Sequence, residues 1–284
     1  MGSRVRDFCS VLILAIALAA TAYSQTPAIY PGGVLNGASF DKTGQPVSPG
    51  ALISIFGTDL AAASESALSV PLSTTLSSVK VTFNGIEAPL KDVVHTPGTY
   101  DQINAQVPWE ILKVVPPGTN TTAGVQVIVS RNGVPSAPFT ANVGAAAPGI
   151  FTFQYGIGQA VAYGNTDYQI AAPTNAGLPY PSHPAKIGDP LTLAILATGL
   201  GPVKDSVPNG GLPAGGASPT VTNPTVLVGG VPAQVVFCGL IGYVGVYQIN
   251  IVIQPGTPTG NAVPLQIQMN GITSRNDVTI AVTN

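Results

Sequence analysis

The feature that most constrains the fold of this chain is a short motif that occurs twice. Residues 101–108 read DQINAQVP and residues 247–255 read YQINIVIQP. In both copies, Gln-Ile-Asn opens an alternation of polar and apolar residues that ends at a proline. Alternation with a period of two is typical of a β-strand, and proline ends a strand because it has no N–H to offer the sheet. The motif therefore predicts a tandem repeat built from strands.

The segments around the two copies also repeat in the same order. Each copy follows a turn, an apolar strand, a glycine corner and a hairpin, and precedes a second hairpin. The matched segments are residues 48–60 with 186–201, the hairpin turns Asn84-Gly85 with Gly229-Gly230, and Asn132-Gly133 with Asn270-Gly271. Corresponding positions lie about 140 residues apart, which suits two β-sandwich domains and is too long for a solenoid repeat. We place domain 1 at residues 28–146 and domain 2 at residues 147–284.

One segment of domain 2 has no partner in domain 1. Residues 203–224 contain many Gly, Pro, Ser and Thr and show no apolar periodicity. Long segments of this kind are functional loops or mobile ones. We therefore expect an exposed, mobile surface loop here.

The first 24 residues predict a secretory signal peptide. Arg4 and Arg6 precede an apolar run at residues 11–20, and small residues follow it. This three-part pattern marks proteins for export, and the run is shorter than the roughly 20 residues that span a bilayer. We expect an exported protein that is secreted, periplasmic or held at the cell surface, with a membrane anchor as the weaker interpretation.

Composition and charge narrow the class of protein and partner. Charged residues make up only 8% of the chain, whereas it contains 33 Gly and 27 Pro among 284 residues. Frequent turns and short strands rich in Val, Ile and Thr predict an all-β protein, and Pro or Gly interrupts each later apolar run. The formal net charge is -2 with no basic stripe, which argues against nucleic acid or an anionic membrane surface as a partner.

The longer motifs resemble a known family. They include VLNGASF, PGALISIFGTDLA, QINAQVPWE, APGIF, ATGLGPV and YQINIVIQPG, and they extend over nearly the whole chain after the signal segment. This combination is similar to the uncharacterised C-terminal domain family that is abundant in Solibacter and other Acidobacteria. The resemblance implies two tandem immunoglobulin-like β-sandwich domains of the IPT/TIG kind and an exported setting. It implies no catalytic or binding residues, because none is established for the family.

A search for catalytic residues finds little. The only histidines, His95 and His183, lie in proline-containing turns, and no G-x-S-x-G pentapeptide or H-E-x-x-H motif is present. Removal of the signal peptide leaves Cys238 as the one cysteine, in an apolar strand where a buried thiol is expected. We therefore expect no enzyme, no cofactor and no fixed metal site. The sequence leaves open whether acids gather around calcium between the domains.

Two features stand out as candidate binding surfaces. The first is the polar face of the duplicated strands, and the second is Trp109, the only tryptophan, with the neighbouring Tyr100. The candidate residues are Tyr100, Gln102, Asn104 and Trp109 in domain 1 and Gln248 and Asn250 in domain 2. The amides could equally face solvent, and the indole could fill the domain junction.

These observations favour one function and keep a second open. We expect an exported, non-catalytic protein for adhesion, surface assembly or interaction, whose partner is an extracellular or envelope protein. The alternative is a carbohydrate-binding module in which Trp109 and the Gln-Ile-Asn strand bind a polysaccharide. Edge strands at either end of a sandwich also allow weak self-association.

Overall fold

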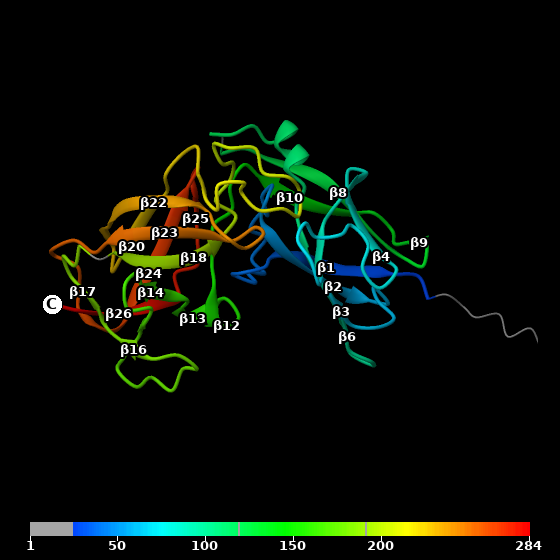
Figure 1. Cartoon of the computed structure of the whole chain (residues 1–284). Helices are drawn as coiled ribbons and strands as arrows, with labels where there is room; N and C mark the ends of the chain where they lie inside the picture. The colour runs from blue at the N-terminus through cyan, green and yellow to red at the C-terminus, as the bar shows by residue number, and fades with distance from the viewer. Residues whose placement is uncertain (1–24, 119, 191) are drawn as a thin grey trace, which may run out of the picture.

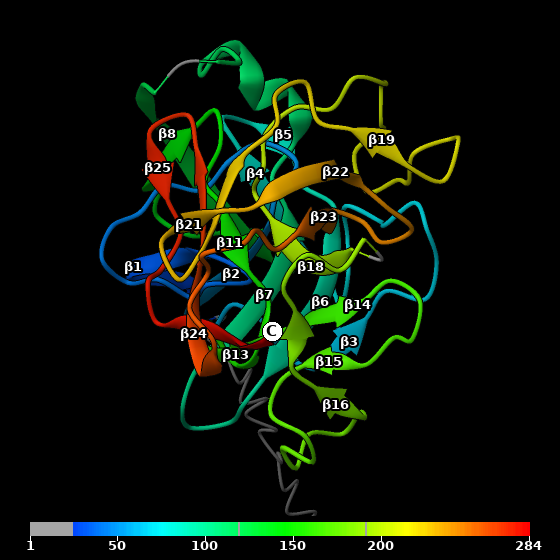
Figure 2. The ribbon, with the colours of Figure 1, turned by 90° about the vertical axis from the view of Figure 1, so that its left-hand side faces the viewer.

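The computed structural model describes residues 25–118, 120–190 and 192–284, which form two β-sandwich domains lying side by side (Figure 1). The predicted signal peptide, residues 1–24, lies outside the described residues. Figure 2 shows the molecule from the domain 2 end, with domain 2 in front of domain 1. No helix in the described part of the chain is long and apolar enough to cross a bilayer.

Domain 1 consists of two antiparallel five-stranded sheets. The first has the order β1 (Ala28–Asn36), β2 (Leu52–Thr58), β7 (Asp101–Gln106), β6 (Leu90–His95) and β3 (Glu65–Ser66). The second has the order β10 (Phe139–Gly144), β8 (Thr122–Arg131), β4 (Val79–Phe83) and β5 (Ile86–Glu87), with β9 (Val134–Pro135) paired to β8. A short 3-10 helix, η1 (Trp109–Lys113), follows β7.

Domain 2 repeats this arrangement with extra short strands. Its first sheet has the order β16 (Ser182–His183), β15 (Ile170–Ala171), β14 (Ala162–Gly164), β18 (Leu193–Thr198), β23 (Tyr247–Val252), β22 (Gln234–Leu240) and β19 (Ser218–Pro219), with β11 (Gly149–Ile150) paired to β18. Its second has the order β12 (Thr152–Gln154), β13 (Ile157–Ala160), β26 (Val278–Thr283), β24 (Gly260–Met269), β20 (Thr225–Val228) and β21 (Val231–Pro232), with β17 (Ala185–Lys186) paired to β26 and β25 (Ile272–Thr273) to β24.

The strand order establishes the immunoglobulin-like fold in both domains. If the main strands are lettered A to G along the chain, each first sheet has the order A-B-E-D and each second sheet has the order G-F-C. This is the arrangement of the immunoglobulin sandwich. The duplicated Gln-Ile-Asn strands are β7 and β23, and both occupy position E, between strands B and D. The predicted all-β fold of two tandem immunoglobulin-like sandwiches is confirmed.

Each sandwich has its own apolar core between its two sheets. In domain 1, Ile53, Ile103 and Phe83 lie in one fully buried cluster, and in domain 2 Ile249 and Leu265 lie in another. Alternation along β23 buries Tyr247, Ile249 and Ile251 and leaves the residues between them half-buried. The predicted alternation with a period of two therefore gives the sheet one buried face and one half-buried face.

Four hairpins turn at the dipeptides that the sequence singles out. Asn84-Gly85, Asn132-Gly133, Gly229-Gly230 and Asn270-Gly271 all have positive φ at both residues. A two-residue turn with two positive φ angles matches the right-handed twist of the strands, and Asn and Gly adopt it at least cost. These turn predictions are confirmed.

Residues 203–224, which the sequence predicts to be an exposed, mobile loop, contain both exposed and buried residues and a short strand. The segment contains β19, which pairs with β22, and an isolated bridge joins Val203 to Thr220. Its middle lies on domain 1, where the Leu72 N–H donates to the carbonyl oxygen of Gly210 at 2.8 Å. Gly and Pro in this segment allow a compact path across the junction, which composition alone does not predict.

Hydrogen bonds between side chain and backbone join the two domains. The Leu52 N–H donates to Thr198 Oγ1 at 2.9 Å, and the Thr198 hydroxyl donates to the Gly245 carbonyl at 2.6 Å. Asn36 Nδ2 donates to the Ala147 carbonyl at 2.8 Å. Thr198 and Asn36 are buried, so water does not compete for these bonds and they restrict the angle between the domains.

Candidate functional site

The candidate site is a groove of about 920 Å³ that both domains line. A volume of this size lies within the range of ligand-binding clefts. We call it the aromatic groove because tyrosine and phenylalanine rings make up much of its wall. Its lining residues are Tyr30, Pro31, Gly32, Gly33, Leu35, Ser39, Phe40, Lys42, Phe56, Tyr100 and Gln102 from domain 1 and Tyr155, Ile157 and Arg275 from domain 2.

A bulge in β1 shapes one wall of the aromatic groove. The pairing of β1 with β2 shifts register between Ile29 and Val34, and Gly32 within the shift has a φ of +66°. A Cβ at Gly33 would lie 2.6 Å from the Phe56 carbonyl oxygen, so only glycine fits this close approach. The Pro-Gly-Gly sequence therefore lifts Tyr30 and Pro31 away from the regular strand.

Four aromatic rings form a continuous row along the aromatic groove. The ring centroids of Tyr155 and Phe40 lie 6.2 Å apart, those of Phe40 and Phe56 6.3 Å, and those of Phe56 and Tyr100 5.8 Å. All three pairs are tilted or edge-to-face, the arrangements that the ring quadrupoles prefer. The rings at the two ends are the most accessible, because Tyr155 is 83% exposed and Tyr100 46% exposed.

Close contact between the backbones of the two domains positions Tyr155, the ring at the domain 2 end of this row. Tyr155 and Gly156 form the tip between β12 and β13, and both have positive φ. A Cβ at Gly156 would lie 1.9 Å from the Ser39 carbonyl oxygen of domain 1. Glycine at this position therefore lets the hairpin press against domain 1, and the contact places Tyr155 beside Phe40.

A chain of side-chain hydrogen bonds orients Gln102 at the groove wall. Gln102 Nε2 donates to Asn104 Oδ1 at 2.8 Å, Ser54 Oγ donates to the same oxygen at 2.7 Å, and Asn104 Nδ2 donates to Asp92 Oδ2 at 3.3 Å. Burial alone would raise the pKa of Asp92, but hydrogen bonds from Lys91, Ser66 and Asn104 lower the pKa below its usual value. The ionised carboxylate fixes the direction of both amides. Among the described residues, no donor is bonded to the side-chain oxygen Oε1 of Gln102, which is thus left as an acceptor.

The structure brings together only some of the predicted binding residues. Tyr100 and Gln102 line the aromatic groove, and Asn104 supports Gln102 from behind. Gln248 and Asn250 repeat the amide pair in domain 2, where Gln248 Nε2 donates to Asn250 Oδ1 at 2.7 Å and Tyr163 Oη donates to Gln248 Oε1 at 3.3 Å. That second pair is not part of the groove lining.

Trp109 lies at the domain junction, away from the aromatic groove. Its ring is in contact with Gly50, where a Cβ would lie 2.0 Å from a ring carbon, and it packs against the core of domain 2. Its backbone N–H donates to Asn209 Oδ1 at 2.9 Å. The indole therefore occupies the packing position that the sequence offered as one of two interpretations.

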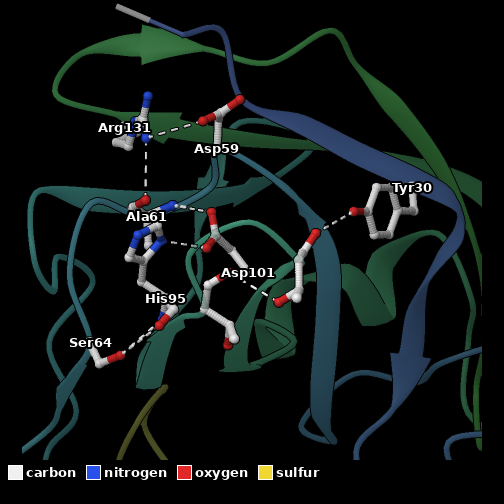
Figure 3. A network of polar contacts seen from close by, with 9 residues as sticks. Tyr30, Asp59, Ala61, Ser64, His95, Asp101 and Arg131 are labelled. Carbon is white, nitrogen blue, oxygen red and sulfur yellow. Dashed lines mark hydrogen bonds and ion pairs between the residues drawn. The ribbon is translucent and has the colours of Figure 1, made fainter.

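A network of polar contacts connects side chains and backbone groups of domain 1 (Figure 3). His95 Nδ1 and Asp101 Oδ1 lie 2.7 Å apart, and Asp101 Oδ2 accepts the Ala61 N–H at 3.1 Å. Arg131 donates to the Ala61 carbonyl at 3.2 Å, and Ser64 Oγ accepts the backbone N–H of His95 at 2.9 Å. The serine hydroxyl is bound to the backbone of His95 and not to its ring, so this group ties strand ends together.

The remaining side chains that could take part in catalysis, His183 and Cys238, are held by contacts within the protein. His183 Nε2 lies 2.6 Å from Asp167 Oδ2. Burial raises the pKa of the Cys238 thiol to about 12, so the reactive thiolate is scarce at neutral pH. Within the described ranges, no group of three or more His, Cys, Asp or Glu side chains is placed to hold a metal ion.

Sequence reasoning missed most residues of the aromatic groove. Tyr30, Phe40, Phe56 and Tyr155 come from separate strands and turns and share no motif with Tyr100. One available signal was the Pro-Gly-Gly stretch inside an otherwise regular strand, because glycine in a strand marks a bulge or a close approach. The contribution of domain 2 depends on the domain angle, which no local pattern reports.

Comparison with protein-family models finds no match, and comparison with curated proteins finds none either. Among solved structures, the chain is similar to a Bacteroides ovatus protein, SGBP-B of a mixed-linkage glucan utilization locus, in complex with a mixed-linkage heptasaccharide. The identity is 9%, the match covers 84% of this chain and 43% of that one, and the TM-score is 0.31. The chain thus spans less than half the length of that protein.

Two further structures show a similar degree of likeness. The Ig1-2 module of the Drosophila receptor protein tyrosine phosphatase DLAR is 14% identical, with 91% of this chain and 100% of that one covered and a TM-score of 0.20. The Yersinia pseudotuberculosis adhesin InvE is 11% identical, with 83% and 56% covered and a TM-score of 0.21. TM-scores this low add nothing to the fold assignment, which rests on the strand order.

Proposed function

We propose that this protein is an exported, non-catalytic binding protein that attaches to an extracellular or envelope polysaccharide through the aromatic groove. The row of rings from Tyr155 to Tyr100 carries the proposal. The apolar C–H face of a sugar ring packs on aromatic side chains, and an extended chain of sugars would contact several rings in succession.

Hydrogen-bonding groups in the aromatic groove support a sugar ligand. Gln102 offers an acceptor whose direction is set by Asn104 and Asp92. Sugars present many hydroxyl donors, so an oriented acceptor beside stacked rings suits them. The same surface would serve adhesion if the polysaccharide belongs to another cell or to the organism's own envelope.

A pull-down on insoluble polysaccharides, followed by affinity electrophoresis with soluble ones, tests this proposal. The protein is the chain from residue 25 onward, alongside its Tyr155→Ala and Tyr100→Ala variants. Loss of one stacking ring is expected to weaken binding about fivefold. Tyr180→Ala is the matched control, because Tyr180 is 60% exposed and does not line the groove.

The outcomes separate the proposal from its competitors. Retention that Tyr155→Ala and Tyr100→Ala reduce, and Tyr180→Ala leaves unchanged, supports the aromatic groove. Retention that Tyr155→Ala and Tyr100→Ala leave unchanged would overturn the aromatic groove as the binding surface. Capture of an envelope protein with no retention on any polysaccharide would overturn the proposal in favour of a protein partner.

A further inference from the structure

The charged residues of the aromatic groove differ in sign from the chain as a whole. The chain has 12 acidic and 10 basic side chains. The described residues that line the groove include two cations, Lys42 and Arg275, and no carboxylate. A lining that has cations and no carboxylate favours an anionic ligand where a cation is not already paired within the protein.

The two cations are not equivalent. Arg275 is held by Asp277, with Nε donating to Oδ1 at 2.9 Å, and lies 3.9 Å from a carboxylate oxygen of Asp41. Its charge is therefore largely compensated within the protein. Asp41 also accepts the Thr43 N–H at 2.8 Å.

Lys42 is the uncompensated cation. It is exposed, and none of the ion pairs between described residues includes it. A lysine ammonium is a compact, flexible point charge that pairs with carboxylate or sulfate groups. Its place in the groove wall puts this charge beside the row of rings.

Resting on the proposed function, we infer that the polysaccharide is acidic and carries carboxylate or sulfate groups. The rings contact the apolar faces of the sugars while Lys42 pairs with an anionic substituent on one of them. A neutral polysaccharide would use the rings and Gln102 but would leave the lysine without a role.

Two matched pairs of polymers test this inference and distinguish the two anions. Polygalacturonate is compared with its carboxyl-reduced product, and dextran sulfate with dextran, by affinity electrophoresis at low and high salt. We expect binding to one or both acidic polymers that weakens with salt, and about a fivefold loss in Lys42→Gln. Lys204→Gln is the control, because Lys204 is exposed but lies outside the groove.

The remaining outcomes overturn the inference, and they separate it from the proposed function. Equal binding of an acidic polymer and its neutral partner, with Lys42→Gln unchanged, refutes the acidic ligand. In that case a loss in Tyr155→Ala would leave the polysaccharide function standing. Absence of binding to every polysaccharide would refute both, and so would binding to polyglutamate alone, since that result assigns the groove to an acidic polypeptide. Unchanged thermal unfolding of Lys42→Gln establishes that the variant is folded.

Discussion

Gly50 illustrates how one residue without a side chain can set the fit between two domains. Its φ of +75° belongs to the left-handed region, and the Trp109 ring occupies the space where a Cβ would be. The position therefore has a backbone requirement and a packing requirement at the same time. The ring in turn contacts the core of domain 2.

Gly50→Ala is predicted to destabilise the protein more than an alanine substitution that strains the backbone alone. Gly85→Ala is the matched control, because Gly85 has a φ of +81° and nothing within 4 Å of its Cβ position. Gly85→Ala should cost about 1 kcal/mol, whereas Gly50→Ala should cost about 1–3 kcal/mol more because the tryptophan must move. The free energy of unfolding in urea measures both variants. Equal losses would show that the Trp109 contact is not tight.

At the residue scale, the sequence identifies side chains that can bind a ligand, but it predicts less well which of them lie together in the fold. Tyr100 and Gln102 were identified because they lie on the duplicated strand, and both line the aromatic groove. Trp109 was identified as the only tryptophan, and its place at the junction could not be decided from composition. Tyr155 has no local signal, because its ring partner Phe40 comes from the other domain.

Among the elements, strand β7 differs from its duplicated counterpart, β23, at its C-terminal end. Its counterpart β23 continues the alternation through Val252, whereas β7 ends in Gln106, which is completely buried. Gln106 Nε2 donates to the Gly50 carbonyl at 3.1 Å, and its Oε1 accepts the Gly210 N–H at 2.6 Å. Repeats predict strands and hairpins well, because both depend on local patterns. They do not predict this contact, because it belongs to only one copy.

Strand β16 depends on a contact that pH should alter. His183 on β16 bonds to Asp167, which lies between β14 and β15, and this bond raises the pKa of His183 above its usual 6.5. Burial alone would raise the pKa of Asp167, but hydrogen bonds from His183 and Gln169 lower it below its usual 3.8. The ion pair is complete between these two pKa values. It is lost as pH rises through the raised pKa of His183, or falls through the lowered pKa of Asp167.

NMR titration of the His183 ring should therefore show a pKa above 6.5, and Asp167→Asn should return it toward that value. Both side chains are more than a third exposed, so we expect little change in the global free energy of unfolding. Protection of the β16 amides, measured relative to their intrinsic exchange rate at each pH, should decrease above the pKa of His183. A ring pKa below 6.5 in the unmodified protein would contradict the assigned pair.

On the scale of the whole molecule, the contacts at the junction lead us to expect that the two domains behave as one body. Buried hydrogen bonds of Gln106 and Thr198 cross it, and residues 203–224 lie over it. The sequence predicts two adjoining domains, but it does not predict their angle, because that angle depends on contacts between surfaces far apart in the chain. The aromatic groove is lined by residues of both domains at this angle.

Calorimetry should show a single unfolding transition for the protein and two for a variant with a weakened junction. Gln106→Leu with Thr198→Val removes the side-chain partners of the Gly210 and Leu52 N–H groups. Each buried group left without a partner should cost about 1–3 kcal/mol. Gln126→Leu is the control, because Gln126 is exposed and bonds only within domain 1. A single transition in the double variant would mean that other contacts couple the domains.

The groove wall from β1 to the Tyr155 hairpin has a consequence for any ligand it holds. A molecule bound across both domains adds contacts between them, so the free energy of binding and the stability of the junction are thermodynamically linked. Substitutions that loosen the junction, such as one at Asn36, should then lower affinity although that side chain does not line the groove. By reciprocity, bound ligand should stabilise the junction, and the molecule would be most rigid when it is attached.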